Sequence, residues 1–195
     1  MEYPDFYNEI EHIVLKDNLS SFLGSTGEGI IDFSYLDIVK MAGHSCVLVS
    51  GTYLMALKGL RRLYGTETPV RGEIKVEMRG SLEEGNTGAS ARVLSNITGA
   101  TSNSGFRGIN GQYNRRGLLV YGADIPYKVR LTRLDTHKSV DVNYIPEKVV
   151  NPGPIMQSAI GPEATEESRK SFPIRWQEMI RSIFLHADEV IDVFA

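Results

Sequence analysis

The residues best able to do chemistry stand in one short stretch, Gly43-His44-Ser45-Cys46. Cys46 is the single cysteine of the chain, and His44 precedes it by two positions. The glycine interrupts the helical pattern before it, and a second, apolar helix is expected to start at about Ser45. A thiol at a helix start faces unpaired backbone N–H groups and the positive end of the helix dipole, and both favour the thiolate.

An imidazole two residues from a thiolate suits two kinds of chemistry. The pair can bind a transition metal such as zinc, or it can act as base and nucleophile in a metal-free thiol enzyme. The structural alternative is simple packing, because free cysteine is among the most buried residue types. Two protein ligands are too few for a structural metal site, so water, a substrate, another side chain or a second subunit must complete the shell.

Three further histidines are present. His12 falls on the polar side of a helix predicted over residues 5–23, which could pack near residue 44, so His12 is a further candidate ligand. His137 lies in a predicted hairpin turn and is expected to be exposed. His186 follows the last predicted helix, where a cation suits the negative end of the dipole.

A second candidate region is the glycine-rich segment from Thr98 to Gly117, in which glycine recurs every third residue between Gly105 and Gly111. No strand leads directly into it and no Gly-Lys-Ser or Gly-Lys-Thr sequence occurs, so it is neither a dinucleotide fingerprint nor a phosphate loop. Its arginines could bind an anion such as a substrate carboxylate, and these are Arg107, Arg115 and Arg116. The alternative is a solvated loop, or a loop that packs on a partner subunit.

Composition narrows the class of protein. The 195 residues include 21 Lys and Arg against 24 Asp and Glu, and this net charge of −3 gives no reason to expect nucleic acid as a partner. A single cysteine excludes an internal disulfide and any zinc ribbon or iron–sulfur cluster built by one chain. Lys58 and Arg61 interrupt the longest apolar run, and the acidic N-terminus lacks a signal-peptide core, so we expect a cytoplasmic protein without a membrane span.

The hydrophobic pattern predicts an α+β fold, with three or four mostly antiparallel strands flanked by helices. Helices are expected over residues 5–23, 35–42, about 45–64 and 163–185, with Pro173 marking a restart of the last one. Strands are expected over residues 30–33, 73–79, 118–121, 126–134, 139–145 and 190–194. Residues 89–97 fit a strand or a helix, and we favour a helix for their later half. The prolines between 146 and 162 predict an irregular connector.

Taken together, residues 33–122 resemble the E-subunit-like family of formylmethanofuran dehydrogenase. Its first hallmark, a Gly-His-X-Cys segment that opens a long buried helix, corresponds to residues 43–46. Its second, a Thr-Gly-Cys-Thr segment before a glycine-rich loop, corresponds to Thr98-Gly99-Ala100-Thr101. The chain departs from the family at Val47, where proline is usual, at Ala100, where the second cysteine stands, and in lacking the C-terminal zinc ribbon.

The resemblance implies an α+β core similar to the catalytic, C-terminal domain of glyceraldehyde-phosphate dehydrogenase, a homodimer, and a transition metal, commonly zinc, near the His-X-Cys turn. It adds Thr98, Gly99 and Thr101 to Arg107 and Arg115 as expected pocket residues for a small-molecule ligand. Residues 1–150 are expected to form the α+β domain that resembles this family. Residues 151–195 are expected to form a connector and a helix that packs on that domain or on a partner subunit.

Three functional hypotheses follow. The leading one is a metal-binding domain with His44 and Cys46 as ligands and an open coordination position. The second is a thiol enzyme that uses Cys46 as nucleophile and His44 as base or charge partner. The third is an interaction module without chemistry, in which the loop over 99–117 and the C-terminal helix hold a partner.

Overall fold

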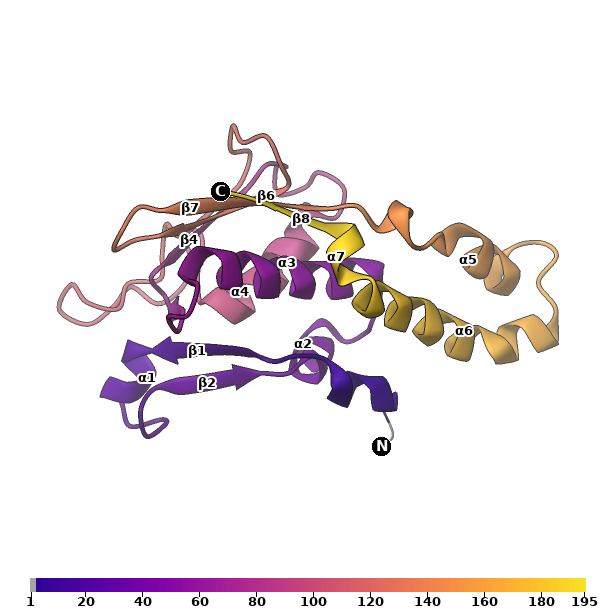
Figure 1. Cartoon of the computed structure of the whole chain (residues 1–195), viewed down its shortest axis with the longest axis horizontal. Helices are drawn as coiled ribbons and strands as arrows, with labels where there is room; N and C mark the ends of the chain where they lie inside the picture. Colours follow the sequence, from indigo (N-terminus) through magenta and orange to yellow (C-terminus); the bar gives the residue numbers. More distant parts are fainter. Residues whose placement is uncertain (1–2) are drawn as a thin grey trace.

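The computed structural model describes residues 3–195 and shows an α+β fold, as the sequence predicts (Figure 1). The helices, in chain order, are η1 (Asp5–Glu9), α1 (Asn18–Phe22), α2 (Tyr35–Ala42), α3 (Val47–Tyr64), α4 (Thr87–Thr98), η2 (Pro146–Lys148), α5 (Pro152–Ile160), α6 (Glu166–Leu185) and α7 (Ala187–Val190). The strands are β1 (Ile13–Asp17), β2 (Ile30–Phe33), β3 (Val70–Arg71), β4 (Ile74–Met78), β5 (Leu119–Val120), β6 (Val129–Arg133), β7 (Ser139–Tyr144) and β8 (Ile191–Phe194).

These strands form two sheets rather than the single small sheet expected. The larger has the order β5-β4-β6-β7-β8 and is antiparallel except between β4 and β5. The predicted hairpin is confirmed as β6–β7, in which Leu131 pairs with Val140. The smaller sheet has the order β2-β1-β3, with β1 antiparallel to β2 and parallel to β3.

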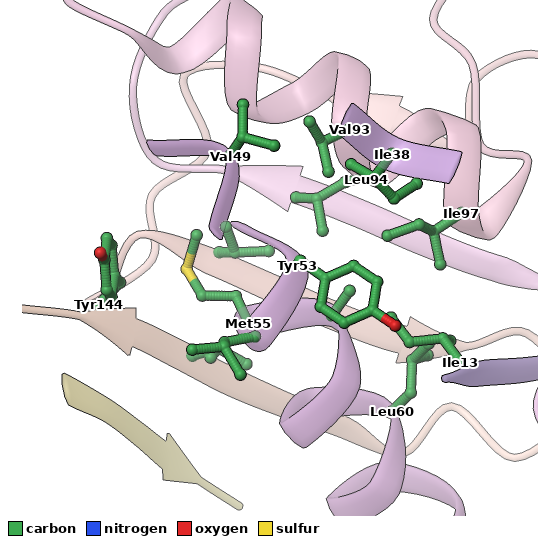
Figure 2. Packing of buried hydrophobic residues seen from close by; sticks show 14 of the residues in the cluster. Ile13, Ile38, Val49, Tyr53, Met55, Leu60, Val93, Leu94, Ile97 and Tyr144 are labelled. Carbon is green, nitrogen blue, oxygen red and sulfur yellow. The ribbon is translucent and has the colours of Figure 1, made fainter. Parts of the chain in front are cut away.

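Helix α3 lies between the two sheets and is the centre of the core (Figure 1). Its residues from Val49 to Ala56 are all buried, because one side faces the larger sheet while the other faces α2, α4 and the smaller sheet. Tyr53 points toward the smaller sheet, and its hydroxyl lies 2.7 Å from the carbonyl oxygen of Glu11 and 3.0 Å from that of Phe33 (Figure 2). A helix segment buried on all sides is largely apolar, as this one is between Val49 and Ala56, whereas Arg61 and Arg62 near its end are exposed.

Two glycines let α3 approach the larger sheet closely. A Cβ atom at Gly51 would lie 2.0–2.5 Å from ring atoms of Tyr144, and one at Gly59 would lie 2.8 Å from Leu131 and 2.9 Å from Val142. The Tyr144 hydroxyl donates a hydrogen bond to the carbonyl of Val47, 2.9 Å away, so the ring is held over the first turns of α3. The cost of glycine in a helix is offset by this close packing.

The prediction of one helix over residues 5–23 is wrong. Residues 5–9 form η1, residues 13–17 form β1, and only residues 18–22 form an α-helix. Ile13, Leu15 and Asp17 are buried while the two residues between them are exposed, which is the period of a strand. The apolar residues between positions 10 and 15 fit both the helical and the strand period. These residues form a strand because they pair with β2.

Three other expectations need correction. Residues 89–97 are helical throughout, within α4. The connector contains α5, which begins with Pro152 in the first turn after an Asn151 cap, a position where the missing N–H of proline costs nothing. Helix α6 runs through Pro173 without a restart, because its packing on α5 before the proline and on α3 after it holds the two parts in line.

The C-terminal region packs on the core through one half of α6. Met179, Ile180 and Ile183 are buried, and Trp176 also contacts the core. The first half of α6 pairs instead with α5, and the two helices project together from the body of the molecule (Figure 1). Within residues 3–195 no helix is both long enough and apolar enough to cross a membrane.

Substituting Gly51 with alanine is expected to destabilise the fold by about 1–3 kcal/mol, because the new methyl group overlaps the Tyr144 ring. Gly27→Ala is the matched control, since Gly27 is exposed and a Cβ there meets nothing within 4 Å. Urea unfolding monitored by circular dichroism measures both. Equal stability of the two variants would contradict the close approach of α3 to β7.

Candidate functional site

The Gly43–Cys46 turn is built as the sequence predicts, between two well-defined helices. A capping box formed by Ser34 and Asp37 starts α2. Gly43 ends α2 in the left-handed conformation, with φ at 80°, which glycine adopts without strain. Cys46 is the N-cap residue of α3. The chain therefore reverses sharply, and the three residues after the glycine are fixed by the two helix ends.

His44 is exposed, but its ring is not free to rotate. Its Nδ1 atom lies 3.1 Å from the carbonyl oxygen of Ala42. A carbonyl can only accept, so Nδ1 donates in this contact, and Nε2 is the ring nitrogen left for a ligand. Metal-binding histidines commonly have this arrangement, in which a backbone carbonyl fixes the tautomer and leaves the other nitrogen as ligand.

Ser45, rather than His44 or Cys46, anchors the turn to the core. Its side chain is buried, and its hydroxyl lies 2.8 Å from the hydroxyl of Tyr35. Its carbonyl accepts a hydrogen bond from the indole nitrogen of Trp176 at 3.0 Å, which joins the turn to α6. The serine between the two candidate ligands is thus a structural residue.

Cys46 is half-buried and packs against the edge of the hydrophobic core. Its side chain makes no capping hydrogen bond, although its position at the start of α3 faces the first N–H groups of that helix. The phenols of Tyr35 and Tyr144 are its electrostatic neighbours, and burial raises the pKa of each of them above the ordinary value of 10.0. Both phenols therefore stay neutral around the thiol at neutral pH.

His12 does not join this pair. It lies immediately before β1, where its Nδ1 contacts both carboxylate oxygens of Asp32, at 2.9 and 3.0 Å. Among residues 3–195 no group of three or more His, Cys, Asp and Glu side chains is arranged to hold a metal ion. One chain therefore brings two candidate ligands, His44 and Cys46, to the turn.

A second cluster lies at the far end of β1, around the buried carboxylate of Asp17. One oxygen accepts from Arg71 Nη1 at 2.8 Å and the other from Arg115 Nη2 at 2.8 Å. The latter oxygen also accepts from the backbone N–H groups of Leu19 and Ser20 and so caps α1. Burial alone acts to raise the pKa of Asp17, but the hydrogen bonds from Arg71 and Ser20 and the charge of Arg115 outweigh it and hold this pKa below the ordinary 3.8.

The two arginines of this cluster are bound differently. Arg71 uses all its remaining donor groups at the end of α4, where Nε and Nη2 donate to the carbonyls of Ile97 and Asn96, each at 3.0 Å. Arg115 Nη1 is buried and has no hydrogen-bond partner among the described residues. It lies against Gly72 and Gly99, both with positive φ, where a Cβ atom would come within 2.2 and 2.3 Å of it.

Of the five pocket residues expected from the sequence, three line one hollow of about 470 Å³ beside this cluster, namely Gly99, Thr101 and Arg115. Thr98 is fully buried beneath it and its hydroxyl donates to the carbonyl of Leu94. Arg107 is exposed on the same loop and does not line the hollow, and Arg116 is also exposed.

Sequence reasoning missed Asp17 and Arg71 as site residues. The helix predicted over residues 5–23 puts Asp17 on a polar helix face, whereas the carboxylate ends a strand and is buried. The burial alternates over residues 13–17, but the sequence Ile-Val-Leu-Lys-Asp does not, so it carries no local signal for a buried carboxylate.

The two regions lie at opposite ends of one pair of helices. Thr52, near the start of α3, contacts Ser90, near the start of α4, with 3.2 Å between their hydroxyl oxygens. Beyond the other end of α3, Arg71 of β3 binds the last carbonyls of α4. The helices therefore run in the same direction, and the His44–Cys46 turn and the Thr98–Thr101 segment are separated along their length.

Asp17→Asn is expected to destabilise the protein by about 3–5 kcal/mol at pH 7, because it leaves two arginines without their shared carboxylate. A depressed folded pKa stabilises the native state above the unfolded pKa, and this contribution is lost as the pH falls through the folded value. The difference in free energy of unfolding between wild type and Asp17→Asn should therefore narrow progressively below pH 3.8. Chemical denaturation across this range measures it, with Asp124→Asn as the exposed control. If the difference in free energy of unfolding stays constant as the pH falls through this range, the stabilising role given to the ionised Asp17 carboxylate is contradicted.

Comparison with known proteins adds no family to this geometry. No protein-family model matches the chain, and a search of curated proteins finds no significant match.

Proposed function

We propose that this protein binds a transition metal, zinc in the first instance, through His44 Nε2 and the thiolate of Cys46. A neutral imidazole and a thiolate are ligands that zinc and similar borderline-soft ions prefer. The proposal takes up the resemblance to the E-subunit-like family of formylmethanofuran dehydrogenase, whose first hallmark is the sequence over residues 43–46.

The observation that carries the proposal is the hydrogen bond between His44 Nδ1 and the carbonyl of Ala42. A ligand histidine benefits from a fixed tautomer, and unlike His186, whose Nδ1 makes the same kind of contact with the carbonyl of Ser182, His44 has a thiol two residues away. Cys46 follows two residues later on a backbone held by Gly43 and by the two bonds to Ser45. Both candidate ligands are therefore presented by a rigid segment.

A homodimer is part of this proposal, because one chain supplies two ligands from its described residues and a tetrahedral ion takes four. Two copies related by a two-fold axis through the site would provide a His₂Cys₂ set. If instead each chain binds its own ion, water or a substrate completes the coordination shell, and the site is then open for catalysis or sensing. A free thiol ligand suits a reducing compartment, so a cytoplasmic location belongs to the same proposal.

The bound ion would supply Lewis acidity and a lowered pKa for a coordinated water. The contribution of the chain's own residues is more specific. The carbonyl of Ala42 orients the imidazole, and the turn places the Cys46 side chain at the N-cap position of α3.

The second candidate is metal-free thiol chemistry at Cys46, and one observation favours it. The N-cap thiol makes no capping hydrogen bond and so remains available as a nucleophile beside the first turn of α3. This candidate predicts rapid alkylation of Cys46 near neutral pH that a chelator does not change. Metal ligation predicts slow alkylation that becomes faster once a chelator is added.

Elemental analysis of protein purified without added metal is expected to show one ion per chain, or one per two chains if the ligands come from both subunits. Cys46→Ser and His44→Ala should each lose most of the ion. Both changes leave the fold intact, because serine is a good N-cap residue and His44 is exposed.

His137→Ala is the control, since His137 is exposed in the β6–β7 turn and should leave the metal content unchanged. A cobalt-loaded sample gives a second readout, a thiolate-to-cobalt absorption band that disappears in Cys46→Ser. Metal content that neither substitution lowers would refute the proposal.

A further inference from the structure

The hollow beside Asp17 continues into a second one along α4. The first, of about 470 Å³, is bounded by β1, α1, Arg71 and the loop over 99–117. The second, of about 530 Å³, lies between α4 and residues 101–105 of the same loop. Ser95, Asn96 and Thr101 line both hollows, so the two lie next to each other along α4, and together they are called the groove.

One face of α4 presents unpartnered polar side chains to this groove. Arg92, Ser95 and Asn96 are spaced three and four residues apart, so they lie side by side on the helix surface. None of these three side chains has a hydrogen-bond or ion-pair partner among residues 3–195. Their donors therefore face the groove and are available to a ligand.

The groove is positively charged in a protein whose net charge is −3. Three arginines and one acidic residue line it, namely Arg71, Arg92, Arg115 and Asp17. The Asp17 carboxylate is fully used by two of the arginines and two backbone N–H groups. Asp17 is the ion-pair partner of both Arg71 and Arg115, so Arg92 is the lining arginine without a counter-charge among the described residues. The lining as a whole keeps a positive charge, which attracts anions.

The loop wall of the groove is fixed rather than mobile. Thr101 donates to the carbonyl of Arg115 through its backbone N–H at 2.9 Å and through its hydroxyl at 2.7 Å, and its own carbonyl accepts from Leu118. Gly105 lies so close to Thr101 that a Cβ atom there would be 2.3 Å from the threonine hydroxyl oxygen. Phe106 lines the first hollow and is 42 % exposed, which offers an apolar surface next to the polar one.

We infer that this groove binds a small anionic molecule that carries a phosphate or carboxylate group. The anionic group binds the guanidinium of Arg92 with the side chains of Ser95 and Asn96. The body of the ligand extends past Thr101 toward Phe106. Arg71 and Arg115 contribute positive potential at that end. This site is separate from the His44–Cys46 turn, so its test does not depend on metal.

Titration of ¹⁵N-labelled protein with inorganic phosphate, and separately with succinate, tests the inference. At least one of the two is expected to give saturable shifts concentrated at the amides of Ser95, Asn96, Gly99 and Thr101. Saturation by phosphate alone assigns a phosphorylated ligand, and saturation by succinate alone assigns a carboxylate.

Arg92→Gln is expected to lower the affinity for the saturating anion about tenfold, the loss typical of one charge-assisted hydrogen bond. Arg92→Lys should retain part of the affinity, and Ser95→Asp should abolish binding by placing a carboxylate beside Arg92. Arg62→Gln is the matched control, because Arg62 is exposed on α3 and likewise has no partner among the described residues. Shifts that do not saturate with either anion, or equal losses in Arg92→Gln and Arg62→Gln, would overturn the inference.

Discussion

The Asp17 carboxylate joins three parts of the chain that are far apart in sequence: the consecutive elements β1 and α1, strand β3, and the glycine-rich loop. It ends β1, caps α1, and binds Arg71 of β3 and Arg115 of the glycine-rich loop. Through Arg71 it also holds the last carbonyls of α4. Charges buried in this way are costly unless every partner is in place, so they select one arrangement of the segments more than they add stability. The smaller sheet, the end of α4 and the long loop are positioned together because they share this one acceptor.

The turn before α3 depends on a different constraint, the burial of α3 from Val49 to Ala56. Tyr144 reaches over Gly51 to the carbonyl of Val47, and Ser50 donates to the carbonyl of Cys46 at 3.0 Å. The beginning of α3 is therefore fixed from the sheet side, while Trp176 fixes the turn from α6. The side chains of His44 and Cys46 gain their orientation from a core in which neither plays a central part.

Much of this architecture can be predicted from periodicity and caps. The strict alternation of β4, the hairpin β6–β7, Ser34 at the start of α2, Gly43 at its end and Gly65 after α3 all have local signals, and the structure confirms each. Local signals fail where two periods fit the same residues, as in residues 10–15, and where proline starts a helix instead of breaking one, as at Pro152. In both cases tertiary pairing or a cap decides the outcome.

The candidate sites divide in the same way. The spacing of His44 and Cys46 is local, and their turn is predictable from the glycine and the helix start. Asp17 lies 54 residues from Arg71 and 98 from Arg115 along the chain, and no short motif encodes such contacts. Arg92, Ser95 and Asn96 escape prediction for another reason. Three free polar side chains on a helix are ordinary in a sequence. Only the position of residues 101–105 opposite them makes this face of α4 one side of a groove.

The guanidinium of Arg115 passes between Gly72 and Gly99 and closes the base of the loop over 99–117. The loop can leave the body only if this side chain withdraws from between two glycines and abandons Asp17. Trypsin cleaves after arginine, and Arg107 and Arg116 are exposed on this loop. The rate of cleavage at those two peptide bonds therefore reports on local opening of this loop, to which the release of Arg115 contributes.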